Sequence, residues 1–302
     1  MNLRGILALI LIFPATLALA ADGSFDKTLS LDGTATLSIS SGSGYIHVYS
    51  GSGDQVHITG HVHANPSWFS SDADQRVKRI VASPPVTQSG NTIRVGAGLS
   101  DSGLFNNISI DYDVTAPRAT ILTANTGSGG IEIGGIEGTV SAETGSGSIH
   151  ADNIGANARL QTGSGRIQAT NVRGAANLQA GSGSIELSLA APGDVKAQTG
   201  SGSIHIDGLS GGLRAGTGSG SVEIAGNPTS EWRIESGSGS IHVHTPTNAR
   251  FTLNAETGSG SIQSARPMIM QGDLNRHHVV GGVNGGGPTL RAETGSGSIS
   301  LD

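Results

Sequence analysis

Two short histidine motifs are the residues of this sequence best suited to metal chemistry. His61-Val62-His63 and His242-Val243-His244 each place two imidazoles on one side of an extended strand, because successive side chains of a strand point in opposite directions. Zinc accepts imidazole ligands, but it needs three or four ligands in total. The sequence assures no third ligand, so these four histidines are weak metal candidates with exposed strand histidines as the alternative, and we predict no metal and no cofactor.

A second candidate site consists of histidines and glutamates that recur at one position after successive Gly-Ser-Gly segments. If the repeats stack as coils in register, these side chains form one outward row with neighbours about 4.8 Å apart. Such a row could bind a ligand or a partner. Alternatively, the alternation avoids like charges on neighbouring strands, which destabilise a sheet. The candidate partner surface is His150, Glu186, His205, Glu223 and His242, within the expected row Glu132, His150, Gln168, Glu186, His205, Glu223, His242, Gln263.

The many Gly-Ser-Gly segments do not match known ion-binding or phosphate-binding loops. A P-loop needs a Gly-Lys-Ser/Thr sequence that leads into a helix, whereas an alternating strand pattern follows each copy here. Calcium-binding nonapeptide repeats need an aspartate in each turn, and these copies have none. The segments are therefore expected to act as structural corners.

The corners are spaced so regularly that they define a repeat architecture. The first glycines of successive copies keep a nearly constant interval, which doubles only before the last copy. Fixed periods of this length are typical of stacked structural coils. The corner glycines are Gly127, Gly145, Gly163, Gly181, Gly200, Gly218, Gly237, Gly258 and Gly295.

Apolar residues alternate on both sides of each corner, which predicts strands and not helices. Val140, Ala142 and Thr144 precede one corner, and Ile149 and Ala151 follow it, all with side chains expected to point inward. We predict an all-β fold, a β-solenoid with 18–19-residue coils and two main strands per coil. Glycine permits the sharp corner and leaves room for the corner of the next coil. An antiparallel meander has the same period but would not place like residues over like.

The ends of the repeat region differ from its middle. Residues 36–48 contain an early copy of the motif, and a helix is expected over about residues 71–82, with Ser71 as its cap, followed by a hairpin at residues 86–95. These elements would cap the N-terminal edge, as solenoids require. We therefore divide the chain into residues 1–20, 21–120 and 121–302, with an irregular insertion at 264–288 whose Met268, Ile269, Met270, Val279 and Val280 would cover the flank of the last coils.

Composition and the first twenty residues indicate an exported protein. The chain has 302 residues, 48 glycines, 3% aromatic residues and no cysteine, so its core must be narrow and aliphatic and has no disulfides. The net charge of −6 without a basic run argues against nucleic acid as a partner. Residues 1–20 combine Arg4, an apolar run and a final Ala-Leu-Ala, which predicts a signal peptide cleaved after Ala20; an uncleaved anchor is the alternative. No later segment is apolar enough to span a membrane as a helix.

Three features resemble a bacterial family labelled putative adhesin, a domain of unknown function built from β-solenoid coils. They are the strand ISIDYDVTAPRATIL, the run of TGSGSI copies and the ending VVGGVNGGGPTLRAETGSGSISL. The resemblance extends from Leu29 to Asp302. It implies a location in the cell envelope and contact with surfaces, and it transfers no catalytic residues.

We predict an exported, non-enzymatic β-solenoid that acts as an adhesion or scaffold module through its lateral faces. It would be periplasmic, on the cell surface or secreted, with an envelope protein or a glycan as partner. The first alternative is a glycan- or metal-binding protein that uses the outward row. The second is a degenerate polysaccharide-acting enzyme; this class uses clustered acids beside aromatic platforms, whereas the sequence has only Trp68 and Trp232 as tryptophans and shows no acidic cluster across consecutive coils.

Overall fold

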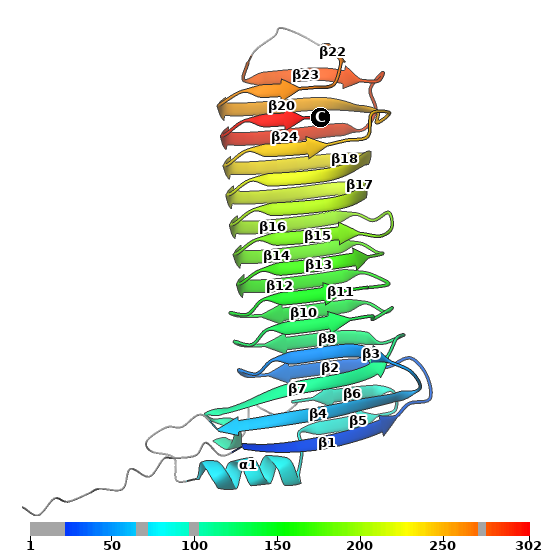
Figure 1. Cartoon of the computed structure of the whole chain (residues 1–302), viewed down its shortest axis with the longest axis vertical. Helices are drawn as coiled ribbons and strands as arrows, with labels where there is room; N and C mark the ends of the chain where they lie inside the picture. Colours follow the sequence, from blue (N-terminus) through cyan, green and yellow to red (C-terminus); the bar gives the residue numbers. More distant parts are fainter. Residues whose placement is uncertain (1–21, 65–71, 97–102, 271–275) are drawn as a thin grey trace, which may run out of the picture.

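The protein is an elongated stack of β-coils (Figure 1). The computed structural model describes residues 22–64, 72–96, 103–270 and 276–302. The predicted signal peptide at 1–20, Trp68 and Ser71 lie outside the described residues. The prediction of an all-β solenoid with one short helix is confirmed. Within the described part of the chain, no helix has the length and apolar character needed to cross a membrane.

Each coil contributes a strand to each of two walls. Wall A holds the strands that precede the Gly-Ser-Gly corner, and wall B holds the strands that follow it. Wall A comprises β2 (Thr36–Ser41), β8 (Ile121–Thr126), β10 (Val140–Thr144), β12 (Ala158–Ser164), β14 (Ala176–Ser182), β16 (Val195–Ser201), the second parts of β17 (Ile204–Ser219) and β18 (Val222–Ser238), β24 (Thr289–Ser296) and β20 (Phe251–Ser259). Wall B comprises β3 (Ile46–Gly51), β9 (Ile131–Gly134), β11 (Ile149–Asp152), β13 (Ile167–Val172), β15 (Ile185–Leu189), the first parts of β17 and β18, β19 (Ile241–His244), β25 (Ile299–Leu301) and β21 (Ile262–Ser264).

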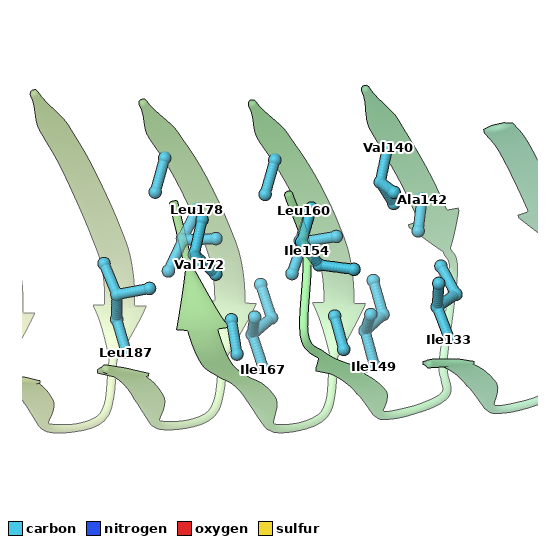
Figure 2. Close-up of a cluster of buried hydrophobic side chains, with 14 of the residues drawn as sticks. Ile133, Val140, Ala142, Ile149, Ile154, Leu160, Ile167, Val172, Leu178 and Leu187 are labelled. Atoms are coloured by element: carbon cyan, nitrogen blue, oxygen red, sulfur yellow. The ribbon is translucent and has the colours of Figure 1, made fainter. Parts of the chain in front are cut away.

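The interior is a column of identical or similar aliphatic residues. Ile149 pairs with Ile167, Ile167 with Ile185, and Ile185 with Ile204, all in parallel register. Each of these side chains is at most 1% exposed. Figure 2 shows side chains from both walls, and Ile154 from the segment after β11, pointing into the same column. The parallel stacking of like on like excludes the antiparallel meander for these coils.

Close contact between successive corners requires glycine at the first corner position. A Cβ added to Gly163 would lie 2.4 Å from the carbonyl oxygen of Gly145 in the coil beneath. Since real Cβ atoms do not approach a backbone oxygen this closely, the corners can nest only without side chains. The threonine before the corner makes a hydrogen bond between coils that the sequence did not predict. The buried Thr144 Oγ1 donates to the Gly129 carbonyl at 2.8 Å, and equivalent residues repeat this bond in most coils.

The N-terminal end is closed by further strands and the helix. β7 (Ile108–Pro117), β4 (Gln55–Ala64) and β1 (Asp22–Ser30) extend wall B, while β6 (Thr92–Val95) and β5 (Val86–Ser89) extend wall A. The predicted hairpin is β5–β6. Helix α1 (Ala73–Ala82) buries Val77 and Ile80, and its N-cap is Asp72, whose side chain makes no capping hydrogen bond. A short 3₁₀ helix, η1, spans Gly103–Phe105.

The C-terminal end departs from the order of the sequence. The last coil, β24 and β25, lies between β18–β19 and β20–β21, so that Gly295 stacks on Gly237 and Gly258 stacks on Gly295. The prediction that the insertion covers the flank of the last coils is wrong. Instead β23 (His278–Val283) pairs antiparallel with β20, and β22 (Met268–Met270) pairs with β23, which extends wall A beyond β20 (Figure 1).

Candidate functional surface

The outward row of wall B runs through the whole stack, with one correction to its order. Because the last coil is inserted, Ser300 and not Gln263 follows His242. The row also continues downward, since His47 of the first coil pairs with Glu132. Its order is therefore His47, Glu132, His150, Gln168, Glu186, His205, Glu223, His242, Ser300, Gln263.

In the C-terminal half of wall B, acidic side chains and histidines contact one another alternately. His205 Nε2 lies 2.9 Å from Asp207 Oδ2, and His205 Nδ1 lies 3.4 Å from Glu223 Oε2. The other oxygen of Glu223 lies 3.7 Å from His244 Nε2, and His244 Nδ1 lies 2.6 Å from Asp302 Oδ1. The chain Asp207–His205–Glu223–His244–Asp302 thus runs across β17, β18 and β19 to the residue after β25, and all five side chains are about half exposed.

In the N-terminal extension of wall B, the first histidine motif lies in a similar arrangement. His63 Nδ1 is 2.9 Å from Asp22 Oδ1, and its Nε2 is 3.5 Å from Asp111 Oδ2. Asp113 lies between His61, at 3.5 Å, and His47, at 2.8 Å. Wall B therefore carries interleaved imidazoles and carboxylates at both ends of the molecule.

These contacts differ from a metal centre. Among the residues that the structure describes, no group of three or more histidine, aspartate or glutamate side chains converges closely enough to hold a metal ion. The second motif is divided between different partners, because His242 Nδ1 contacts Ser300 Oγ at 2.6 Å while His244 contacts Asp302. The histidines of the two motifs thus contact separate polar neighbours and do not converge on one metal position. These are His61, His63, His242 and His244.

Comparison with protein families assigns the chain to one family. Residues 122–302 match the model described as Toastrack DUF4097. The chain belongs to the Toastrack family, a domain of unknown function. No curated protein sequence matches it. The chain is also similar to the solved structure of a putative cell adhesion protein from Clostridium sporogenes, with 12% identity, coverage of 93% of this chain and 98% of that chain, and a TM-score of 0.27.

Two further solved structures are similar to this Toastrack chain. A putative adhesin from Bacteroides fragilis shows 12% identity and a TM-score of 0.29, and one from Parabacteroides distasonis shows 10% identity and a TM-score of 0.29. Each covers 93% of this chain and 97% of its own chain.

Wall A of the Toastrack chain carries an acidic cluster that the sequence order conceals. The inserted coil places Glu293 between Glu235 and Glu256, so three glutamates stand on adjacent coils, contrary to our prediction. They line a hollow of about 550 Å³ together with corner glycines. Glu235 and Glu293 each form an ion pair with the arginine two residues earlier, Arg233 and Arg291, and the Glu235 partnership raises the pKa of Arg233.

The aromatic residues of the described chain differ in their exposure. Trp232 is fully buried, and its indole Nε1 donates to the Gly211 carbonyl at 2.8 Å, so it cannot serve as a sugar platform. Tyr45 and Tyr49, which the sequence analysis did not consider, are 56% and 46% exposed on the outer side of wall B. A hydrogen bond to Glu132, together with partial burial, raises the pKa of Tyr49 to about 12.

Proposed function

We propose that this protein is an exported, non-enzymatic module of the cell envelope that adheres to, or scaffolds, a partner through its lateral faces. One observation carries the proposal: the outward row of wall B presents polar side chains on every coil, at a constant spacing of about 4.8 Å. A stack held by parallel ladders and nested corners keeps such a row straight and rigid. A partner could then make the same contact repeatedly along the row.

The location of the protein is part of this proposal. The apolar run and the Ala-Leu-Ala of residues 18–20 support cleavage by a signal peptidase. The absence of cysteine means that folding after export would not depend on disulfide formation. N-terminal sequencing of the protein from fractionated cells should find Ala21 as the first residue. A protein that retains Met1 and stays in the cytoplasm would contradict export.

The partner is best sought by capture from an envelope extract. The probe is the full mature chain, and the test variant is His205→Ala combined with Glu223→Ala in the centre of the row. The matched control is Gln179→Ala combined with Lys196→Ala, which lie outward on wall A. We expect the row variant to lose the captured partner and the control to retain it. Equal capture by both variants would remove the row from the proposal.

The two alternatives predict different outcomes. Metal analysis of the purified protein, before and after His205→Ala, tests metal binding by the row. Incubation with plant and bacterial polysaccharides tests catalysis, and the acid cluster of wall A is where a site would lie. Two of its three carboxylates are already bonded to arginine, which argues against free general acids there. Turnover that is lost in Glu256→Gln would contradict the non-enzymatic proposal.

A further inference from the structure

Wall B departs from its own repeat beside the first coil. The residue after the Gly-Ser-Gly corner is serine in most coils, but it is tyrosine at Tyr45 and glycine at Gly130 in the two adjacent coils. Four residues further on, Tyr49 pairs with Gly134, whereas the next coils have Asp152, Thr170 and Ser188. Both tyrosines thus stand next to glycines.

The glycines make room for the rings. A Cβ on Gly130 would lie 3.3 Å from Cδ1 and Cε1 of Tyr45, and a Cβ on Gly134 would lie 2.8 Å from Cδ1 of Tyr49. The Tyr45 ring therefore lies over Gly130, just before β9, and the Tyr49 ring over Gly134 at the end of β9. Both occupy space that a side chain would fill in the other coils. These are two of the four large apolar or aromatic side chains most exposed in the described chain, the others being Ile121 and Ile269.

Polar groups border the two rings and lie between them. His47 stands between the tyrosines on the same side of the strand, with its ring centroid 6.2 Å from that of Tyr45. The Tyr45 backbone N–H donates to Asp111 Oδ1 at 2.8 Å, and His47 Nδ1 lies 2.8 Å from Asp113 Oδ1. Glu132 interacts with the Tyr49 hydroxyl and raises its pKa. The result is an open strip of ring, imidazole and ring, bordered by three carboxylates.

We propose that Tyr45, His47 and Tyr49 form a binding strip for a neutral, extended oligosaccharide. Sugar rings present apolar C–H faces that pack on aromatic rings, and hydroxyl groups at their rims that donate to carboxylates and imidazole. The two tyrosines are four residues apart, about 13 Å along the strand, so an extended chain of several sugars is needed to reach both. This inference rests on the proposed adhesive function and names the ligand class.

The same geometry disfavours other ligands. A quaternary ammonium group needs rings within about 6 Å of the cation, and rings this far apart cannot enclose one. An anionic glycan would be repelled by Asp111, Asp113 and Glu132, the charged groups bonded to the strip. An apolar peptide side chain requires a concave pocket, whereas these tyrosines stand exposed on a sheet face. A neutral glycan satisfies both the rings and the carboxylates.

The test measures binding of the full mature chain to defined oligosaccharides by calorimetry. Cellohexaose and chitohexaose are the neutral probes, and hexagalacturonate is the anionic probe. We expect a neutral probe to bind, and Tyr45→Ala and Tyr49→Ala each to weaken it at least about tenfold, the scale of a lost aromatic contact. Tyr49→Phe, which keeps the ring, should stay within about threefold. Ile121→Ala on wall A is the matched control for an exposed apolar side chain and should change nothing.

A variant that keeps both tyrosines tests whether binding depends on where the Tyr49 ring lies and not only on its presence. Gly134→Ser places a side chain where the Tyr49 ring lies, so it should weaken binding while the melting temperature stays close to that of the wild type. The inference is overturned if neutral probes bind equally to Tyr45→Ala and Tyr49→Ala, if only hexagalacturonate binds, or if no probe binds. In the last case, an envelope protein captured through His205 and Glu223 would leave the proposed function standing.

Discussion

The first and the last coil carry the same core position, but they differ in what covers it. Ile46 of the first coil is fully buried because β7 pairs with β3 on its outer side. Ile262 occupies the same position in the coil β20–β21, which ends the stack on the other side, and it is only partly buried, since β25 is the one strand that pairs with β21 within the described part of the chain. Further strands and a helix close wall B at the N-terminal end, whereas at the C-terminal end the added strands extend only wall A.

The backbone hydrogen bonds show the same difference. In each of the nine coils that precede β21 in the stack, the amide at this core position donates to the coil above. Among the described residues no coil lies above Ile262 to continue the series. A solenoid end is thus closed only where a later segment supplies both the apolar cover and the next hydrogen-bonding edge. The bonds run from Ile46, Ile131, Ile149, Ile167, Ile185, Ile204, Val222, Ile241 and Ile299.

The largest expected effect comes from truncating this core position at three heights in the stack. Ile204→Ala and Ile46→Ala should each lower the free energy of unfolding by about 2–5 kcal/mol, the cost of a cavity in a closed core. Ile262→Ala should cost less than about 1 kcal/mol, because the side chain is already partly in water. Urea denaturation of the three variants measures the differences. An Ile46→Ala effect as small as that of Ile262→Ala would show that the N-terminal end is not closed.

Alanine at the first corner glycine should show the opposite pattern, with little loss of stability in the coil at the N-terminal end and a larger loss in the coil at the C-terminal end. In Gly163→Ala the new methyl group would meet the carbonyl oxygen of Gly145, and in Gly258→Ala that of Gly295. We expect the free energy of unfolding to fall by about 1–3 kcal/mol in each variant, which is the usual cost of overpacking. Gly42→Ala is the matched control, since no atom lies within 4 Å of its Cβ position.

The reason for this pattern is that each corner Cβ points toward the coil on its N-terminal side in the stack, and the first coil has no corner beneath Gly42. Thermal melts of the three variants give the comparison. Equal losses in Gly42→Ala and Gly163→Ala would mean that conformation at the corner, and not contact between corners, requires glycine.

A smaller effect is expected at Tyr112, beneath the first coil. Its hydroxyl is buried and has no hydrogen-bond partner in the described structure, while its ring makes an edge contact with Phe25. Tyr112→Phe removes the unsatisfied group and should leave stability unchanged or raise it by about 1 kcal/mol. A loss of stability would show that the hydroxyl is satisfied and that the N-terminal closure depends on it.

The same residue predicts a dependence on alkaline pH. Burial raises the pKa of Tyr112, and the hydrogen bond to Glu132 raises that of Tyr49 to about 12. The unfolded chain therefore releases these protons first, so stability is complete below about pH 10 and falls as pH rises from there. Urea midpoints measured from neutral to strongly alkaline pH should fall less steeply for Tyr112→Phe than for the wild type.

The period, the strands and the inward positions were predictable because every coil repeats the same local pattern. Val140, Ala142 and Ile149 point inward by parity alone, and the structure buries all three. The order of the last coils was not predictable, since like coils can stack in any order. Inserting β24 between β18 and β20 gives it hydrogen-bonding partners on both sides, and only the structure shows this choice. The position of Ser300 beside His242 and the stacked glutamates of wall A both follow from it.

The tyrosine strip was missed for a different reason. Its signal is a departure from the repeat, glycine at Gly130 and Gly134, and it has meaning only once Tyr45 and Tyr49 are known to lie beside those glycines. In the sequence, the whole N-terminal cap separates the tyrosines from their glycine neighbours. A repeat predicts what every coil shares, whereas a site in one coil requires knowledge of which coils are neighbours.

The smallest expected effect concerns two histidine–carboxylate pairs of wall B, one in the centre of the outward row and one in its N-terminal extension. His205→Gln and His63→Gln remove half-exposed histidines that contact carboxylates, and such exposed pairs contribute about 0.2–1 kcal/mol. We expect both variants to unfold within about 1 kcal/mol of the wild type, because both imidazoles are about half exposed. Urea denaturation of the two variants is the measurement. If His205→Gln instead costs several times more than an exposed pair contributes, the row stabilises the stack, and partner binding is no longer needed to explain why polar pairs occupy this face. If both losses are small, as we expect, stability does not account for the row, and its side chains remain free to contact a partner.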